Sequence, residues 1–147
     1  RIQRIAGHLD ARPPAAARQC EGKAGNLAVI VDGARTPFVK SFGGLMRCDA
    51  IELGCAAVKG LIAKTKVDPK QIDQIIMGNV VVNSNAPNLA REIIIDLQLP
   101  AKIPGSTVSM ACLSGLEAIY QGVCQIEHGD AEVVVAGGSD FLSSGQM

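Results

Sequence analysis

Apolar residues along the chain follow two alternating patterns. Short runs of apolar and β-branched residues are typical of strands, whereas apolar residues three and four positions apart are typical of one face of a helix. The short runs lie at 27–31, 75–82, 106–111 and 132–136, and helical spacing follows Asp49, follows Asn88 and covers 112–127. Strands that alternate with helices require right-handed crossovers and a parallel sheet. The pattern alone therefore predicts an α/β fold with helices on both faces of the sheet.

Polar residues at the expected helix ends support these boundaries. Asp49 and Asn88 are of the types that cap helix N-termini, and Gly129 is of the type that follows a C-terminus. Asp68-Pro69 predicts a short helical turn, and Pro100 ends the helix that begins after Asn88. The inner faces of the first two helices are expected to carry Ile51, Cys55, Val58 and Ile62, and Leu89, Ile93 and Leu97.

One cysteine stands where a predicted strand meets a predicted helix. Cys112 is expected in the first helical turn, where unpaired backbone N–H groups and the helix dipole favour the nucleophilic thiolate. Cys112 also shares a face with Leu116, Ile119 and Val123, so a buried core cysteine is the alternative. Sites in open α/β sheets form beyond the carboxyl ends of the strands, which favours a catalytic role for Cys112.

The residues around Cys112 resemble the nucleophile motif of the thiolases, enzymes that make or cleave 3-ketoacyl-CoA thioesters. Further motifs follow in the order of that family between residues 31 and 140. Asp140 and Leu142 stand where the family usually has Glu and Met. The matching segments are Val31-Asp32-Gly33-Ala34-Arg35-Thr36-Pro37-Phe38, Phe42-Gly43-Gly44-Leu45 with Asp49 and Leu53-Gly54, Asn88-Leu89-Ala90-Arg91, Cys112-Leu113-Ser114-Gly115 and Val135-Ala136-Gly137-Gly138-Ser139-Asp140.

The resemblance implies a three-layer thiolase-like N-terminal half, with a mostly parallel sheet and helices on both faces. It implies that Cys112 attacks the carbonyl of an acyl-CoA and carries the acyl group as a thioester, while its N–H helps to hold the oxyanion. Acyl-CoA and CoA are the expected partners, coenzyme A being a substrate, and no resident cofactor or metal is expected. The sequence does not choose between 3-ketoacyl-CoA cleavage and acetoacetyl-CoA formation.

The resemblance also implies partners for Cys112 that the sequence does not show. In the family, a histidine activates the nucleophile and a second cysteine acts as acid and base, both in the C-terminal half. His128 is expected about 24 Å from Cys112 along the helix, which makes it an exposed helix-end residue. We interpret residues 27–147 as a partial thiolase N-terminal α/β domain without its C-terminal half, a fragment expected to be inactive alone.

The family pairs the strand before the nucleophile with the same strand of a second subunit. The equivalent segment here, 106–110, alternates polar and apolar residues and suits a twofold edge. A homo-oligomer of the full-length form, a dimer, is therefore expected.

Composition excludes several other classes. Fourteen Lys plus Arg balance fourteen Asp plus Glu, and aromatic residues make up 3%, so no nucleic-acid surface is evident. Five cysteines without CxxC spacing argue against a disulfide framework or a zinc site and favour a reducing compartment. No apolar run approaches the roughly 20 residues that cross a bilayer.

Residues 1–26 differ in composition from the rest, being rich in Arg and poor in acidic residues. They are interpreted either as the remnant of a mitochondrial transit peptide or as a disordered leader. The expected location is accordingly mitochondrial or cytoplasmic.

The remaining candidate side chains are interpreted as structural. Cys48, Cys55 and Cys124 are expected in or beside the core, Cys20 is expected to be a free thiol in the leader, and Arg91 is expected to donate structural hydrogen bonds rather than bind CoA.

The sequence also bears on two other functions. A nucleotide-binding module needs a Gly-rich strand-to-helix turn, and none follows a predicted strand. A non-catalytic interaction module built on a thiolase-like sequence remains open.

Overall fold

A computed structural model describes residues 27–84 and 86–144 of the chain, so that predictions for residues 1–26 lie outside the described part. The described residues form three strands, three α-helices and two short 3-10 helices. In chain order these are α2 (Ala50–Thr65), η1 (Pro69–Gln71), β1 (Gln74–Gly78), α3 (Leu89–Asp96), β2 (Gly105–Val108), α4 (Ser114–His128), β3 (Val134–Gly138) and η2 (Leu142–Ser144).

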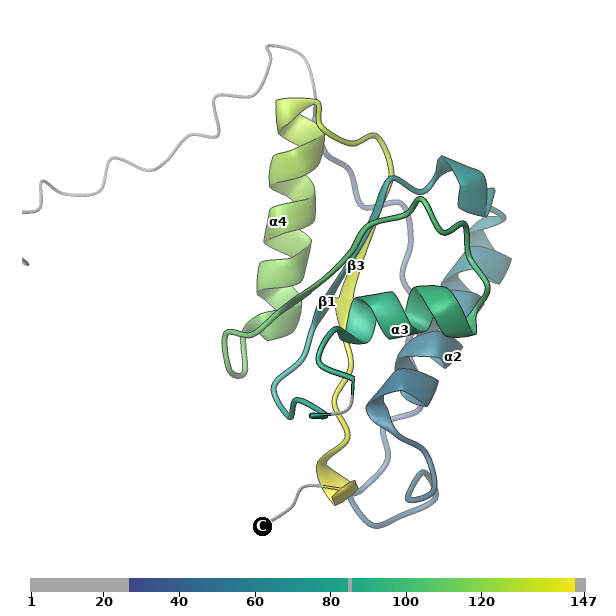
Figure 1. The fold of residues 1–147 in the computed structure, drawn as a ribbon, viewed down its shortest axis with the longest axis vertical. Coiled ribbons are helices and arrows are strands. Elements are labelled where there is room, and N and C mark those ends of the chain that lie inside the picture. Colours follow the sequence, from purple (N-terminus) through teal and green to yellow (C-terminus); the bar gives the residue numbers. More distant parts are fainter. Residues whose placement is uncertain (1–26, 85, 145–147) are drawn as a thin grey trace, which may run out of the picture.

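The strands form one parallel sheet in the order β2-β1-β3. Helix α4 packs on one face of the sheet, and α3, with α2 beside it, covers the other (Figure 1). This arrangement confirms the α/β fold with helices on both faces of a parallel sheet.

The two faces of the sheet are filled differently because side chains alternate along a strand. Ile75 and Met77 of β1 and Val135 of β3 point into the main core, which α3 and α2 complete. Position 78 faces α4, which lies close enough to contact the backbone there. The six most deeply buried large side chains are Ile72, Ile75, Ile76, Ile93, Ile94 and Ile103.

Three predicted helix ends are confirmed, whereas α3 ends at Asp96, before Pro100. Asp49 accepts from the Glu52 N–H at 2.8 Å while the Glu52 carboxylate accepts from the Asp49 N–H at 3.0 Å, a reciprocal capping box. Asn88 caps α3 through the Arg91 N–H. Gly129 ends α4 with a φ of 80°, a left-handed conformation that glycine adopts without steric cost.

The strand predicted at 27–31 is wrong. This segment has no regular secondary structure, and Ile30 and Val31 are each 82% exposed. The segment has the apolar composition of a strand but pairs with none of the described strands, although β2 and β3 each have an outer edge in the order β2-β1-β3. Composition alone does not decide which segments pair, because strand preference depends on the tertiary context.

The strand predicted at 75–82 ends early, at Gly78. Beyond it, the Asn79 N–H still donates to the Val108 carbonyl at 3.0 Å, but the N–H groups of Val80 and Val81 donate to the Asp140 carboxylate instead of to a neighbouring strand. The Asp140 side chain accepts these hydrogen bonds in place of a neighbouring strand, and β1 therefore ends at Gly78.

Asp73 makes a similar contact at the opposite end of the sheet. Its Oδ2 accepts from the N–H groups of Glu132 and Val133, at 2.8 and 3.0 Å, and ties the start of β1 to the start of β3. The hydrogen bonds from Val133 and then Glu132 hold the pKa of this exposed carboxyl below its ordinary value of 3.8. The folded state therefore favours the carboxylate, so the stabilisation is present above that ordinary value and is lost as the pH falls through the folded pKa.

We expect Asp73→Ala to lower the free energy of unfolding by about 1 kcal/mol at pH 7, a figure kept low because the carboxyl is exposed to solvent. Urea unfolding of both proteins as a function of pH checks this. The difference should shrink as the pH falls below 3.8, and a difference that is equally large at the lowest pH would contradict it.

Candidate functional site

Cys112 lies in a tight turn between β2 and α4 rather than in the first turn of the helix. Strand β2 ends at Val108 and α4 begins at Ser114, so the strand predicted at 106–111 and the helix predicted from 112 are each shorter than expected at this junction. The reason is the backbone of Ala111, whose φ of 48° is left-handed and compatible with neither a strand nor a helix. Cys112 therefore precedes the N-cap residue Leu113 and stands at the open end of α4.

Ser114 closes this turn. Its hydroxyl donates to the Ala111 carbonyl at 2.6 Å and accepts from the Met110 N–H at 2.8 Å. The Ser114 N–H also donates to the Ala111 carbonyl, at 3.1 Å, and the side chain is 3% exposed. Sequence reasoning missed this role, although a serine two positions after the candidate nucleophile was the available signal. The buried hydroxyl fixes the conformation that presents Cys112.

The core-cysteine alternative for Cys112 is excluded because α4 turns another face to the sheet. Its buried residues are Ser114, Ala118 and Gly122, spaced four apart. Cys112 is exposed, and Leu116, on the face that the sequence predicted as inner, is 63% exposed. The packed face consists of small residues, which lets α4 approach the sheet closely.

Two glycines of the sheet accept this close approach. A Cβ on Gly78 would lie 2.4 Å from the Ser114 carbonyl carbon and 2.6 Å from the Gly115 nitrogen. A Cβ on Gly138 would lie 3.4 Å from the Gly115 Cα and 3.0 Å from the Gly78 oxygen. The first turn of α4 thus rests on the ends of β1 and β3, which brings Cys112 to the carboxyl edge of the sheet.

His128 cannot reach Cys112 within one chain. It is the last residue of α4, exposed, and its Nδ1 lies 2.6 Å from the Cys124 carbonyl oxygen. Cys112 precedes Ser114, the first residue of α4, and so lies at the other end of the same helix. The prediction of an exposed helix-end histidine is confirmed.

The motif that contains Asn88 and Arg91 has a structural role. The Asn88 Oδ1 accepts from the Thr107 hydroxyl at 3.0 Å, and its Nδ2 donates to the Gly105 carbonyl at 3.0 Å, which ties α3 to β2. The Arg91 Nη1 lies 3.4 Å from the Ala101 carbonyl and 3.5 Å from that of Ile103, both at the long end of hydrogen-bond distances. The predicted structural donor is thus found.

The other described cysteines differ from Cys112 in exposure. Cys48, Cys55 and Cys124 are half-buried, as predicted, whereas Cys112 is exposed. Burial, and then the carboxylate of Asp96, raises the pKa of the Cys55 thiol to about 11. Cys55 is therefore a thiol at neutral pH and a poor nucleophile. Cys20 lies outside the described residues.

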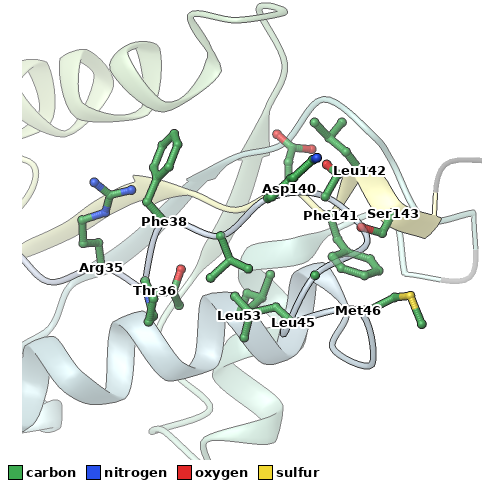
Figure 2. A pocket seen from close by; sticks show the side chains of 15 residues that line it. Arg35, Thr36, Phe38, Leu45, Met46, Leu53, Asp140, Phe141, Leu142 and Ser143 are labelled. Atoms are coloured by element: carbon green, nitrogen blue, oxygen red, sulfur yellow. The ribbon is translucent and has the colours of Figure 1, made fainter.

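A pocket of about 200 Å³ lies between the loop over 35–46 and the segment after β3 (Figure 2). Figure 2 shows Arg35, Phe38, Leu53 and Phe141 around it, with Asp140 at its rim. The Phe42 N–H donates to the Ser143 hydroxyl at 2.9 Å and holds the two segments together. Cys112 does not line this pocket, so the pocket and the reactive turn are separate features.

Among residues 27–84 and 86–144, no three His, Cys, Asp or Glu side chains lie close enough together to hold a metal ion. No helix in the same ranges has the length and apolar character to cross a membrane.

Comparison with known proteins gives a consistent result. The family described as "Thiolase, N-terminal domain" matches residues 28–147. The chain is 40% identical over 116 residues to an acetyl-CoA acetyltransferase of Cupriavidus necator, covering 79% of this chain and 30% of the relative. It is 39% identical over 115 residues to a probable 3-ketoacyl-CoA thiolase of Caenorhabditis elegans, covering 78% of this chain and 26% of the relative.

Two solved structures share the fold. An acetyl-CoA acetyltransferase of Bacillus anthracis superimposes with a TM-score of 0.74 at 30% identity, over 77% of this chain and 29% of that one. A thiolase of Ascaris suum in complex with coenzyme A gives a TM-score of 0.74 at 30% identity, over 78% of this chain and 30% of that one. The chain thus spans less than a third of the length of the relatives it matches.

Proposed function

The chain belongs to the thiolase family through its N-terminal domain, and on that premise we propose that it carries the acyl-accepting cysteine of a thiolase-type acyl transfer between CoA thioesters. The single observation that supports this most is the exposed Cys112 in the turn at the carboxyl edge of the sheet. The reaction is either cleavage of a 3-ketoacyl-CoA or formation of acetoacetyl-CoA.

In the proposed first step, Cys112 gives up its thiol proton to solvent and its Sγ attacks the carbonyl carbon of the acyl-CoA. An S–C bond forms, the carbonyl oxygen becomes an oxyanion, and the bond from that carbon to the sulfur of CoA then breaks. CoA leaves as a thiolate and takes up a proton, and the acyl group stays on Cys112 as a thioester. The Cys112 N–H, beside the open end of α4, is proposed to help hold the oxyanion.

Acyl-CoA and CoA are the proposed substrates, so coenzyme A comes and goes with the reaction and is no resident cofactor. The Ascaris suum thiolase that shares this fold was solved in complex with coenzyme A.

We further propose that this chain alone completes no catalytic cycle. The acid and base needed for the second half of the reaction have no candidate beside Cys112 among the described residues, since His128 lies at the far end of α4. The outer face of α4 carries the exposed apolar residues Leu113, Leu116, Ile119 and Tyr120. Such a face is typical of a helix that packs against further protein.

A homodimer is proposed through β2. This strand lies at the edge of the sheet, where backbone groups of alternate residues face outward and can pair with a second copy. We expect light scattering to give the mass of two chains, with the monomer appearing on dilution. The mass of one chain at high concentration, with a native circular dichroism spectrum, would contradict this.

A non-catalytic, thiolase-like interaction module is the second candidate. The position of His128, which leaves Cys112 without a visible base, is the observation that favours it. A scaffold has no need to accept an acyl group, so acylation separates the two functions.

The experiment incubates the 147-residue chain with acetyl-CoA that is radiolabelled in the acetyl group. The catalytic proposal predicts protein-bound label that hydroxylamine releases, as it does from a thioester, and release of no more than one equivalent of CoA per chain. A chain heated until it unfolds, and then cooled, serves as the control for non-specific acetylation. No protein-bound label would favour the interaction module, and sustained CoA release would contradict the proposed incompleteness.

A further inference from the structure

Asp140 makes the most concentrated set of contacts near the carboxyl edge of the sheet. Its Oδ1 accepts from the Asn79 Nδ2 at 2.9 Å, from the Val80 N–H at 2.9 Å and from the Val81 N–H at 2.8 Å, and its Oδ2 accepts from the Val80 N–H at 3.2 Å. Bonds to an ionised acceptor are roughly twice as strong as bonds between neutral groups. The carboxylate thus fixes the chain where it leaves β1.

Asn79 transmits this constraint to the other strands. Its side chain is 4% exposed, and its Nδ2 donates to the Ser139 carbonyl at 2.9 Å as well as to Asp140. Its backbone N–H donates to the Val108 carbonyl of β2 at 3.0 Å, and the Ser139 N–H donates to the Gly78 carbonyl at 3.0 Å. The ends of all three strands are therefore joined at one buried amide.

The turn that bears Cys112 is attached to these strand ends at two points. It leaves from Val108, whose carbonyl the Asn79 N–H holds, and it enters α4 at Ser114, which lies against Gly78. A shift of the Gly78–Asn79 backbone would consequently displace both ends of the turn.

From this geometry we propose that Asp140 is a positioning residue for Cys112 and acts through Asn79 and the ends of β1 and β2. This role rests on the proposed function, because it takes Cys112 as the residue that accepts the acyl group. Asp140 does not touch the substrate. It holds the turn so that the thiol stays beside the open end of α4.

The chain supplies a matched control. Asp73 also accepts from two successive backbone N–H groups and also joins β1 to β3, but it does so at the opposite end of the sheet. Each replacement removes bonds to two successive backbone N–H groups, and the Asp140 replacement also removes the bond to the Asn79 side chain. Only the Asp140 replacement should change the alkylation rate of Cys112. A general loss of stability would change that rate equally in both variants.

The experiment compares the wild-type chain with Asp140→Ala, Asp140→Asn and Asp73→Ala. Mass spectrometry follows the alkylation of Cys112 by iodoacetamide, and alkylation of half-buried Cys55 reports unfolding. We expect Asp140→Ala to slow Cys112 alkylation at least about threefold, because a displaced turn no longer holds the thiol in its exposed position before α4. Asp140→Asn, which keeps one acceptor oxygen, should fall between Asp140→Ala and the wild type, and Asp73→Ala should match the wild type.

Hydrogen exchange measures the effect of each substitution at individual backbone amides. Asp140→Ala should speed exchange at the Met110 and Ser114 amides, which close the turn, and Asp73→Ala should speed it at Glu132 and Val133. Equal effects of the Asp140→Ala and Asp73→Ala variants on Cys112, or no effect of Asp140→Ala, would overturn the proposal. If Asp140→Ala does not fold, Asp140→Asn decides by the same criteria.

Alkylation needs no acyl-CoA, so the two proposals fail separately. A wild-type chain that accepts no acetyl group would refute the proposed function and leave the alkylation series to decide the role of Asp140. A chain that accepts acetyl groups equally well with and without Asp140, and is alkylated equally fast, would refute the positioning role alone.

Discussion

Replacing Gly78 with alanine is expected to destabilise the chain by about 3 kcal/mol or more and to displace the turn that bears Cys112. The added Cβ would lie 2.4 Å from the Ser114 carbonyl carbon, 2.6 Å from the Ser114 oxygen and 2.6 Å from the Gly115 nitrogen. All three are backbone atoms, so no side chain can rotate away to relieve the contact. Either α4 moves off the sheet or β1 bends.

Gly137→Ala is the matched control. Gly137 lies in β3, the strand beside β1, and a Cβ added there would meet nothing within 4 Å. We expect this change to alter the free energy of unfolding by no more than about 1 kcal/mol. Thermal unfolding of the two variants, with the Cys112 alkylation rate measured on each, checks the prediction. Equal melting temperatures would show that α4 does not rest on Gly78 as described.

The second large effect is expected at Cys112. Cys112→Ala should lower acylation of the chain by acetyl-CoA at least about a hundredfold. The substitution removes the sulfur atom that forms the thioester, rather than a residue that only positions it. The melting temperature should hardly change, since the exposed side chain contributes little to packing. Cys48→Ala is the control, because Cys48 is half-buried and lies before α2, away from the turn.

Retained labelling in Cys112→Ala would assign the acyl group to another residue. Loss of labelling in Cys48→Ala to the same extent would mean that folding rather than chemistry limits the reaction. The catalytic interpretation requires the two cysteine variants to differ.

Local signals in the sequence predicted most of the fold. Asp49, Asn88 and Gly129 each cap a helix through a bond to a residue a few positions away, so a local sequence pattern contains both partners of each cap. The parallel sheet followed from the alternation of patterns, which needs no knowledge of individual contacts. Here prediction succeeded because local preference and overall fold agree.

Long-range contacts caused the errors. Strand β1 ends at Gly78 because Asp140, some 60 residues later in the chain, takes the N–H groups of Val80 and Val81. The segment 27–31 has the composition of a strand but does not pair with β2 or β3 at the edges of the sheet, and no local pattern reveals which segments pair. These outcomes depend on pairing that is decided by the whole fold.

The sequence predicted that Cys112 lies where a strand meets a helix, which is confirmed, but it did not predict the geometry of this turn. Helical periodicity placed Cys112, Leu116 and Ile119 on an inner face, whereas α4 packs through Ser114, Ala118 and Gly122. A helix that must approach the backbone of β1 closely packs through its smallest residues, and hydrophobicity alone does not identify that face. The left-handed Ala111 gave no signal either, since it is not a residue type that favours a positive φ.

The most direct test of the account is a peptide map of the acetylated chain. After incubation with acetyl-CoA and digestion under conditions that preserve thioesters, mass spectrometry locates the acetyl group. We predict that it lies on Cys112, while Cys48, Cys55 and Cys124 remain unacetylated. An acetyl group on any of these other cysteines, or none on Cys112 in a chain that is demonstrably folded, would contradict the claim that this turn presents the acyl-accepting nucleophile.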